Sequence, residues 1–191
     1  FVLKNPINLE FIEEKSREDL KLDSDKEFIV AAGRLVEVKG FDILIQSFNR
    51  IKDDFPNLEL YILGEGILRE ELQTLIDNLD LSNRVKLIGY VVNPYPYFKY
   101  AKACVISSRI EGFPNVLLQM MACNNNIIST LCAGDIEHIN GIYKCQTENV
   151  EDLVTQISDC ITSNTENNRV IFDDYLKKRT FKSYMEEVHK M

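Results

Sequence analysis

The chain has 191 residues, of which 45% are hydrophobic and 27% are charged, a composition typical of one globular domain with a substantial core. Its formal net charge of −8 argues against nonspecific nucleic-acid binding and against a polybasic membrane contact, because both need a positive surface. Any phosphate that the chain binds must therefore be held by a few locally placed cations.

Cysteine and histidine usage points away from a metal site. The cysteines are odd in number and never spaced as C-x-x-C: Cys104, Cys123, Cys132, Cys145 and Cys160. With only two histidines beside them, we expect no bound metal and reduced, partly buried thiols in a cytoplasmic protein. No run approaches the roughly 20 apolar residues of a membrane-spanning helix. The first residue is not Met and belongs to a short apolar run, so we expect the chain to be a fragment of a longer protein.

Short apolar runs alternate with longer amphipathic segments along the chain. The apolar runs predict strands over residues 27–33, 58–63, 85–88, 103–107 and, completing the series, 127–130. Apolar spacings of three and four predict helices over residues 40–52, 67–79, 96–100 and 114–123, and a helical tail over about 150–191 with a polar interruption at 163–168. This alternation predicts an α/β fold, a Rossmann-like doubly wound parallel sheet that binds its ligand at the carboxyl ends of the strands.

The first strand is followed by two glycines and two cations. Gly33-Arg34 comes directly after the strand, and Lys39-Gly40 comes just before the next helix. Glycines permit close backbone approach and a helix start offers free N–H groups, so this junction suits an anion. The same spacing also fits a loop in which Arg34 and Lys39 are simply solvated. The second strand ends in Gly64-Glu65-Gly66, which lacks the third glycine of a dinucleotide fingerprint and reads as a tight turn.

The most informative stretch runs from Ser107 to Gln119. A strand ends there, Glu111 and Gly112 follow, and Pro114 stands where it suits the first position of a helix. The backbone amides of residues 113–116 are then free to point at a ligand, beside the carboxylate of Glu111. This pairing suits a molecule with both hydroxyls and phosphate, although Glu111 would also serve as a partner of the helix dipole.

Seven short motifs occur in a particular order: Asn5-Pro6, Gly33-Arg34-Leu35, Lys39-Gly40, Gly64-Glu65-Gly66, Gly89-Tyr90-Val91, Glu111-Gly112-Phe113 and Cys132-Ala133-Gly134 with Glu137. Together they resemble the C-terminal domain of glycosyltransferase family 4, whose members are retaining, metal-independent enzymes of the GT-B fold. The resemblance covers nearly the whole chain from about residue 5. It implies that residues 1–191 are a single nucleotide-sugar-binding domain, the C-terminal half of such an enzyme, without the N-terminal domain that binds the acceptor.

The resemblance also implies a role for each site residue. Arg34 and Lys39 would hold the diphosphate of the sugar donor, and Glu111 would bind the donor-sugar hydroxyls; these three are the candidate catalytic residues. Tyr90 and Val91 would contact the nucleobase through their backbone. Position 119 corresponds to a glutamate that binds the ribose. The remaining candidate donor-binding residues are Gly33, Gly112, Phe113, Pro114, Asn115 and Val116.

Three positions depart from the family pattern. Gln119 replaces the ribose-binding glutamate, and an amide lacks the charge that strengthens hydrogen bonds to hydroxyls, so we expect weaker ribose binding. Residues 124–126 are three asparagines, which we expect to form a helix-to-strand turn, where the family usually has a Gly-Thr-Pro-like turn. Ala133 replaces the first glycine of a Gly-Gly pair. These departures favour an unusual or degenerate donor site.

The resemblance implies transfer of a sugar from a nucleotide-diphosphate sugar to a saccharide or lipid-linked acceptor, with no cofactor, in bacterial surface polysaccharide or lipopolysaccharide synthesis. The fragment alone is expected to be inactive, and the full-length protein to be cytoplasmic with peripheral membrane association. Two alternatives remain: a sugar-nucleotide epimerase, and a non-catalytic module that has lost donor binding.

Other residues carry structural expectations. We interpret His138 as a surface or packing residue, and the aromatic residues 95, 97, 98 and 100 as packing of a short helix. The tail is locally basic, which we interpret as an interdomain contact first and a membrane contact second: Arg169, Lys177, Lys178, Arg179 and Lys182.

Overall fold

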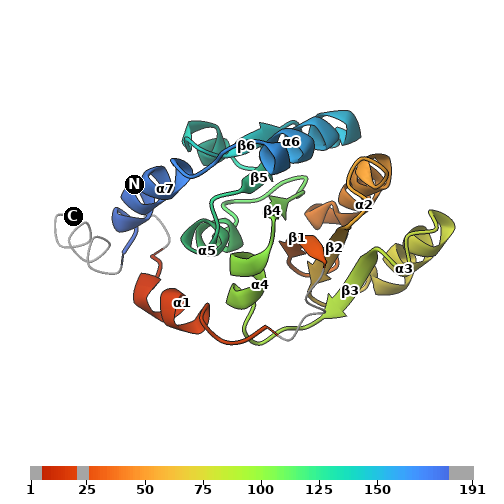
Figure 1. Cartoon of the computed structure of the whole chain (residues 1–191), viewed down its shortest axis with the longest axis horizontal. Helices are drawn as coiled ribbons and strands as arrows, with labels where there is room; N and C mark the ends of the chain where they lie inside the picture. Colours follow the sequence, from red (N-terminus) through yellow and green to blue (C-terminus); the bar gives the residue numbers. More distant parts are fainter. Residues whose placement is uncertain (1–5, 21–25, 181–191) are drawn as a thin grey trace.

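The computed structural model describes residues 6–20 and 26–180, which form a single sheet between two layers of helices (Figure 1). The sheet has six strands, and every neighbouring pair is parallel. In spatial order the strands are β3 (Val85–Gly89), β2 (Leu58–Leu63), β1 (Glu27–Ala32), β4 (Ala103–Ile106), β5 (Ile127–Thr130) and β6 (Tyr143–Cys145). The order reverses between β1 and β4, so the predicted doubly wound, Rossmann-like sheet is confirmed.

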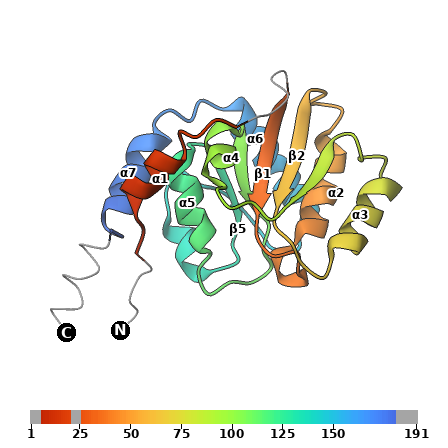
Figure 2. The same ribbon diagram turned by 90° about the horizontal axis from the view of Figure 1, so that it is seen from below.

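The central strands are apolar because both of their faces are covered. All six residues of β2 are buried, and β2 pairs in register with β1 from Glu27↔Leu58 to Ala32↔Leu63. Alternate side chains enter two separate cores, with Ile29 on one face of the sheet and Val30 on the other. Parallel strands end at a common edge, and Figure 2 shows the arrowheads of β1 and β2 together there.

Helices cover the two faces in two groups. One group consists of α2 (Phe41–Ile51), α3 (Arg69–Asn78) and α6 (Val150–Thr162), and its buried side chains share a core with Ile29 and Leu60. The other consists of α1 (Leu9–Lys15), α4 (Tyr95–Tyr100), α5 (Asn115–Cys123) and α7 (Asn168–Lys177), and it covers the face that carries Val30 (Figure 1). Two 3-10 helices complete the fold: η1 (Glu37–Lys39) and η2 (Gly134–His138). Among the helices of the described residues, none is both long and apolar enough to cross a membrane.

The predicted strands and central helices are confirmed, with bounds that shift by one or two residues. The expectation that the strand at residues 127–130 is the last one is wrong, because β6 follows it. That strand has only three residues, too few to show a period. Helix α1, which carries a single buried residue, was not predicted. Pro114 precedes α5 as its N-cap in an extended conformation, so the helix begins at Asn115 instead of at the proline.

The tail is helical only in part. The expected continuous helix beyond residue 168 is wrong for residues 178–180, because α7 ends at Lys177. Thr180 then forms a parallel bridge with Ile7, and the Ile7 N–H donates to the Arg179 carbonyl at 2.8 Å. The two ends of the described chain are thereby joined. Residues 181–191, including Lys182, lie outside the described residues, as does Asn5 of the first motif.

Candidate functional site

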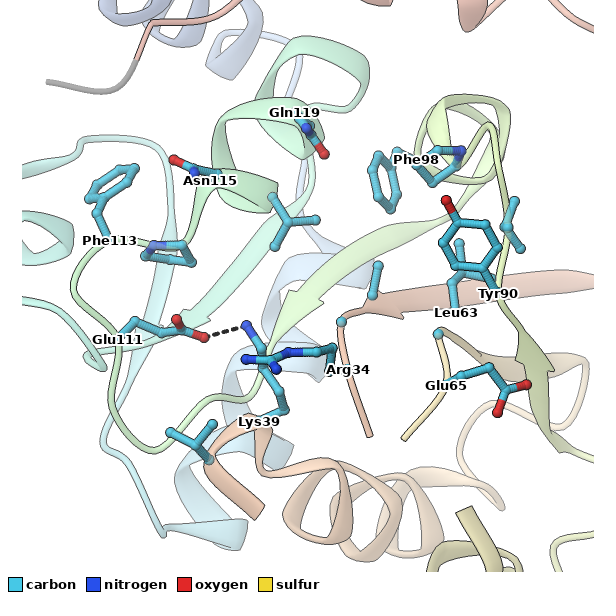
Figure 3. Close-up of a pocket in the computed structure, with 18 residues that line it drawn as sticks. Arg34, Lys39, Leu63, Glu65, Tyr90, Phe98, Glu111, Phe113, Asn115 and Gln119 are labelled. Atoms are coloured by element: carbon cyan, nitrogen blue, oxygen red, sulfur yellow. Dashed lines mark hydrogen bonds and ion pairs between the residues drawn. The ribbon is translucent and has the colours of Figure 1, made fainter. Parts of the chain in front are cut away.

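A pocket of about 580 Å³ opens where the carboxyl ends of β1 to β4 meet (Figure 3). Of the twelve predicted site residues, eleven line it: Gly33, Arg34, Lys39, Tyr90, Val91, Glu111, Phe113, Pro114, Asn115, Val116 and Gln119. Gly112 is exposed and does not line it. The lining also includes residues to which the sequence assigned no ligand role: Ala32, Val38, Leu63, Gly64, Glu65, Pro94 and Phe98.

The loops after β1 and β2 form the floor of this pocket. The Gly33 N–H donates to the Leu63 carbonyl and the Leu35 N–H to the Glu65 carbonyl, each at 2.9 Å. Gly64 has φ +137°, and a Cβ there would lie 1.9 Å from the Gly33 carbonyl oxygen. Only glycine fits at that position. The Gly64-Glu65-Gly66 segment is therefore more than an isolated tight turn, because it is packed against the Arg34 loop and lines the pocket.

A second close contact sets the position of Lys39. Gly40 caps the start of α2 with φ +61°, and a Cβ on it would lie 2.1 Å from the Ser107 carbonyl oxygen. The Ser107 hydroxyl donates to the Lys39 carbonyl at 2.9 Å. The loop after β1 is thus held against the loop after β4, and the Lys39 side chain extends into the pocket (Figure 3).

Lys39 and Glu111 form an ion pair inside the pocket. The Lys39 Nζ lies 2.5 Å from the Glu111 Oε1, and both side chains are only 18% exposed (Figure 3). The Ser108 hydroxyl donates to the same carboxylate oxygen at 2.9 Å. The interpretation of Lys39 as a solvated loop charge is therefore wrong. Arg34 is exposed and makes no ion pair with any other described residue, so its charge is available to an anion.

Arg109 lies in the loop after β4 and connects it to the loop after β1. Its guanidinium donates to both carboxylate oxygens of Asp42, at 2.9 and 2.7 Å, to the Glu37 carbonyl, and to Glu148. Burial would raise the pKa of Asp42, but the hydrogen bonds and charge of Arg109 outweigh it and lower that pKa. The sequence did not indicate this role, because Asp42 and Arg109 are 67 positions apart.

The start of α5 provides the third wall. No side chain caps this helix, although the Leu117 N–H in its first turn donates to the Pro114 carbonyl at 2.9 Å. The start of a helix is in general a place where N–H groups lack an intrahelical acceptor. The helix dipole adds partial positive charge at the same place. Gln119 follows one turn further in and also lines the pocket. An anion near Arg34 would therefore meet both side-chain and backbone hydrogen-bond donors.

The pocket has two chemically different ends. Glu111 and the start of α5 lie at one end, with Arg34 and Lys39 beside Glu111, whereas Tyr90 and Phe98 lie at the other end (Figure 3). Tyr90 is 77% exposed and Phe98 is fully buried. Such an arrangement fits a ligand with a charged, hydroxylated part and a flat, less polar part.

Two of the departures from the family pattern lie away from this pocket. Residues 124–126 precede β5, at the edge of the sheet opposite to the pocket, and form the expected turn. The Asn124 amide donates to the Phe98 and Ala101 carbonyls at 2.7 and 2.8 Å, so its role is structural. Ala133 caps η2 and does not line the pocket. Gln119 is the only one of the three departures that lines the pocket.

The expectations for the thiols, for His138 and for packing of the short helix at Phe98 are confirmed. All five cysteines are free, and burial raises the pKa of Cys123, Cys145 and Cys160 to about 12, so these thiols stay protonated near neutral pH. His138 is exposed, and Phe98 packs α4 against the sheet. Within the described residues, no three His, Cys, Asp or Glu side chains gather as metal ligands would.

Two cations of the basic tail, Arg169 and Arg179, make contacts inside this domain. Arg169 donates to the Met121 carbonyl at 2.7 Å and to Asp173, and Lys177 pairs with Asp174. Arg179 is buried within this domain. Two of the tail cations therefore stabilise the domain itself.

Comparison with known proteins identifies the relatives of this chain. The family model described as "Glycosyl transferases group 1" matches residues 12–179. Over 129 residues the chain is 42% identical to the N-acetylgalactosamine-N,N'-diacetylbacillosaminyl-diphospho-undecaprenol 4-alpha-N-acetylgalactosaminyltransferase of Campylobacter jejuni. Over 118 residues it is 32% identical to a lipopolysaccharide core biosynthesis glycosyltransferase of Rhizobium meliloti. These matches cover 68% and 62% of this chain, but each covers only 34% of the relative.

Solved structures support the fold. A TarM mutant of S. aureus, in complex with fondaparinux, alpha-GlcNAc-glycerol and UDP, superposes on the whole chain with a TM-score of 0.83 at 18% identity. The superposition covers 38% of that protein. The sheet and helices described above are thus those found in one part of a GT-B glycosyltransferase.

Proposed function

The chain belongs to the group 1 glycosyl transferase family, and from that premise we propose that it is the sugar-donor-binding domain of a retaining glycosyltransferase. The observation that carries the proposal is the two-ended pocket. One end combines Arg34, Lys39, Glu111 and a helix start, and the other end is lined by Tyr90, Val91 and Phe98. A nucleotide-diphosphate sugar has the matching sequence of parts: sugar, diphosphate, ribose and base.

In the proposed complex, the diphosphate lies between Arg34, Lys39 and the first turn of α5. Charge-assisted hydrogen bonds from these groups stabilise the negative charge that builds up as the sugar–phosphate bond breaks. No resident metal is needed for this step in the proposal, because the two cations supply the compensating charge.

The sugar and the nucleoside occupy the two ends. Glu111 exchanges its ion pair with Lys39 for hydrogen bonds from the sugar hydroxyls, and this orients the anomeric carbon toward the acceptor. The backbone at Tyr90 and Val91 contacts the base, and Gln119 contacts the ribose. The acceptor oxygen then forms a bond to the anomeric carbon on the face that the diphosphate leaves. The released nucleoside diphosphate takes up the hydroxyl proton.

The acceptor is proposed to come from the rest of a longer protein. The matched region spans about a third of the length of the relatives described above. The names of those relatives specify a diphospho-undecaprenol saccharide and a lipopolysaccharide core. We therefore propose a saccharide or lipid-linked acceptor at the cytoplasmic face of a membrane. On this proposal the 191-residue chain binds its sugar donor but does not transfer the sugar.

Calorimetric titration of the chain with UDP, GDP and their common sugar conjugates tests the proposal. We expect saturable binding of one nucleotide, and we expect Arg34→Ala to weaken it about tenfold or more, the value of one charge-assisted hydrogen bond. Arg50→Ala is the matched control, because Arg50 forms an exposed ion pair with Glu151 away from the pocket. A non-catalytic module would show no binding, or binding that Arg34→Ala leaves unchanged.

A further inference from the structure

Arg179 is a buried cation whose principal neighbours are aromatic rings. Its side chain is 4% exposed, and the guanidinium carbon lies 4.6 Å from the centre of the Phe113 ring and 4.8 Å from that of Tyr175. It also donates to the Tyr175 hydroxyl at 2.5 Å. Among the described residues, the nearest carboxylate is that of Asp135, which is 3.8 Å away and mostly exposed. The rings therefore provide much of the stabilisation that a buried guanidinium requires.

Phe113 belongs to the loop that carries the ion pair of the pocket. It follows Glu111 by two residues, lines the pocket, and precedes α5 by two residues. The Glu111 N–H donates to the Cys132 carbonyl at 2.8 Å. Among the described residues, no backbone group accepts a hydrogen bond from the N–H of Gly112 or Phe113. The Arg179–Phe113 stack is one of the contacts that hold the loop beyond Glu111.

Arg179 is itself held firmly. Its N–H donates to the Leu176 carbonyl at the end of α7, and its carbonyl accepts from the Ile7 N–H. Figure 1 shows α7 beside α5, the helix that the Phe113 loop leads into. The position of Arg179 is therefore set by the framework and not by the pocket loop.

We propose that Arg179 is a positioning residue, which holds Phe113 so that Glu111 and the first turn of α5 face the ligand in one geometry. Arg179 does not line the pocket, whereas Phe113 does, so the effect of Arg179 on binding is indirect. The importance of this effect for sugar-donor binding rests on the function proposed above, whereas the positioning of Phe113 does not. A planar guanidinium can stack on two rings, which the compact ammonium of lysine does less well, so Arg179→Lys should loosen the loop while keeping the charge.

The first test compares two conservative variants. Arg169 also lies in the tail, over the Phe172 ring at 6.0 Å, and donates to a backbone carbonyl, but it does not touch a residue of the pocket. We expect Arg179→Lys to raise the Kd of the bound nucleotide about five- to tenfold, and Arg169→Lys to leave it unchanged. Thermal melting of both variants records any general loss of stability. Equal effects of the two variants on Kd, or no effect of Arg179→Lys, would overturn the proposal.

The second test needs no ligand. The chain contains no tryptophan, so Phe113→Trp introduces a single fluorescent reporter at the loop. In this background we expect Arg179→Lys to increase iodide quenching and to shift the emission to longer wavelength, and Arg169→Lys to do neither. Unchanged quenching contradicts the positioning role of Arg179, whether or not a nucleotide binds. The absence of nucleotide binding, by itself, would argue only against the proposed function. If Arg179→Lys does not fold, Phe113→Leu removes the same contact, and an unchanged nucleotide Kd in that variant counts against the proposal.

Discussion

Among single residues, Gln119 differs most clearly from the family pattern while remaining in the pocket. Its amide can donate to one hydroxyl and accept from another, but neither bond is strengthened by a full charge. Gln119 can therefore make the ribose contact proposed above, but its hydrogen bonds are weaker than those of a glutamate. The degenerate-site alternative thus depends on one side chain, since residues 124–126 lie at the other edge of the sheet.

Restoring the charge at this position should strengthen binding of the sugar donor. For Gln119→Glu we expect about tenfold tighter binding, which corresponds to ~1.4 kcal/mol for a hydrogen bond that gains a charged acceptor. Calorimetric titration of the variant with the nucleotide that binds the native chain measures this change. Gln73→Glu, on the exposed face of α3, controls for the added negative charge. Affinity that stays the same within error would mean that residue 119 does not meet the ribose.

At the scale of elements, the pocket is made by loops held against one another at glycine contacts. The loop after β1 packs on the loop after β2 at Gly64, and on the strand end of β4 at Gly40. Arg109 adds an ion pair to the start of α2. The conformation of each loop therefore depends on its neighbour, and the loops at the separate strand ends form one continuous surface.

Gly64→Ala tests this dependence. The added Cβ would lie 1.9 Å from the Gly33 carbonyl oxygen at a φ that disfavours other residues, so we expect a loss of about 2–4 kcal/mol in the free energy of unfolding. Urea denaturation followed by circular dichroism measures it. Gly134→Ala is the control, because a Cβ there meets no atom within 4 Å and the residue does not have a positive φ. A Gly64 variant as stable as the Gly134 variant would show that the loops can separate without cost.

At the scale of the whole molecule, a buried carboxylate joins β2 to β3 and to the residue that precedes β1. Glu59 on β2 is 1% exposed and accepts hydrogen bonds from Lys26 at 2.7 Å, Lys86 at 2.9 Å and the Tyr61 hydroxyl at 2.7 Å. Burial would raise its pKa, but these three hydrogen bonds outweigh it, so the pKa of Glu59 is lowered from 4.5. A carboxyl whose pKa is lower in the folded state stabilises the fold above its unfolded pKa. This stabilisation is lost as the pH falls through the folded pKa.

The contribution of Glu59 to the free energy of unfolding should therefore vary with pH. Glu59→Gln is expected to lower the free energy of unfolding by about 2–4 kcal/mol at pH 7, because it leaves two lysines without their buried partner. The difference between the native chain and the variant should shrink as the pH falls below about 4.5. Urea titrations at pH 7, 5 and 3.5 measure both effects. Glu27→Gln, which removes the exposed ion pair with Lys102, should change stability little at any pH.

The sequence predicted the sheet from local patterns, and it predicted most of the pocket from the strand ends together with the resemblance to a known family. Buried strands are continuous apolar runs, and the carboxyl edge of a parallel sheet places Arg34, Tyr90 and Glu111 together once the strands are known. The contacts that it did not predict join distant positions. Lys39 meets Glu111 across 72 positions and Asp42 meets Arg109 across 67, and no local periodicity records such pairs. Strand β6 was missed because three residues show no pattern.

The ion pair between Lys39 and Glu111 has a consequence for turnover on the proposed function. In the structure Lys39 and Glu111 each neutralise the charge of the other. An intact sugar donor replaces both partners at once, since its phosphate meets the lysine and its hydroxyls meet the carboxylate. The product nucleotide satisfies only the lysine and leaves Glu111 with the Ser108 hydroxyl but no cation. On the proposed function, re-formation of the pair then competes with the bound product and favours release of the spent nucleotide.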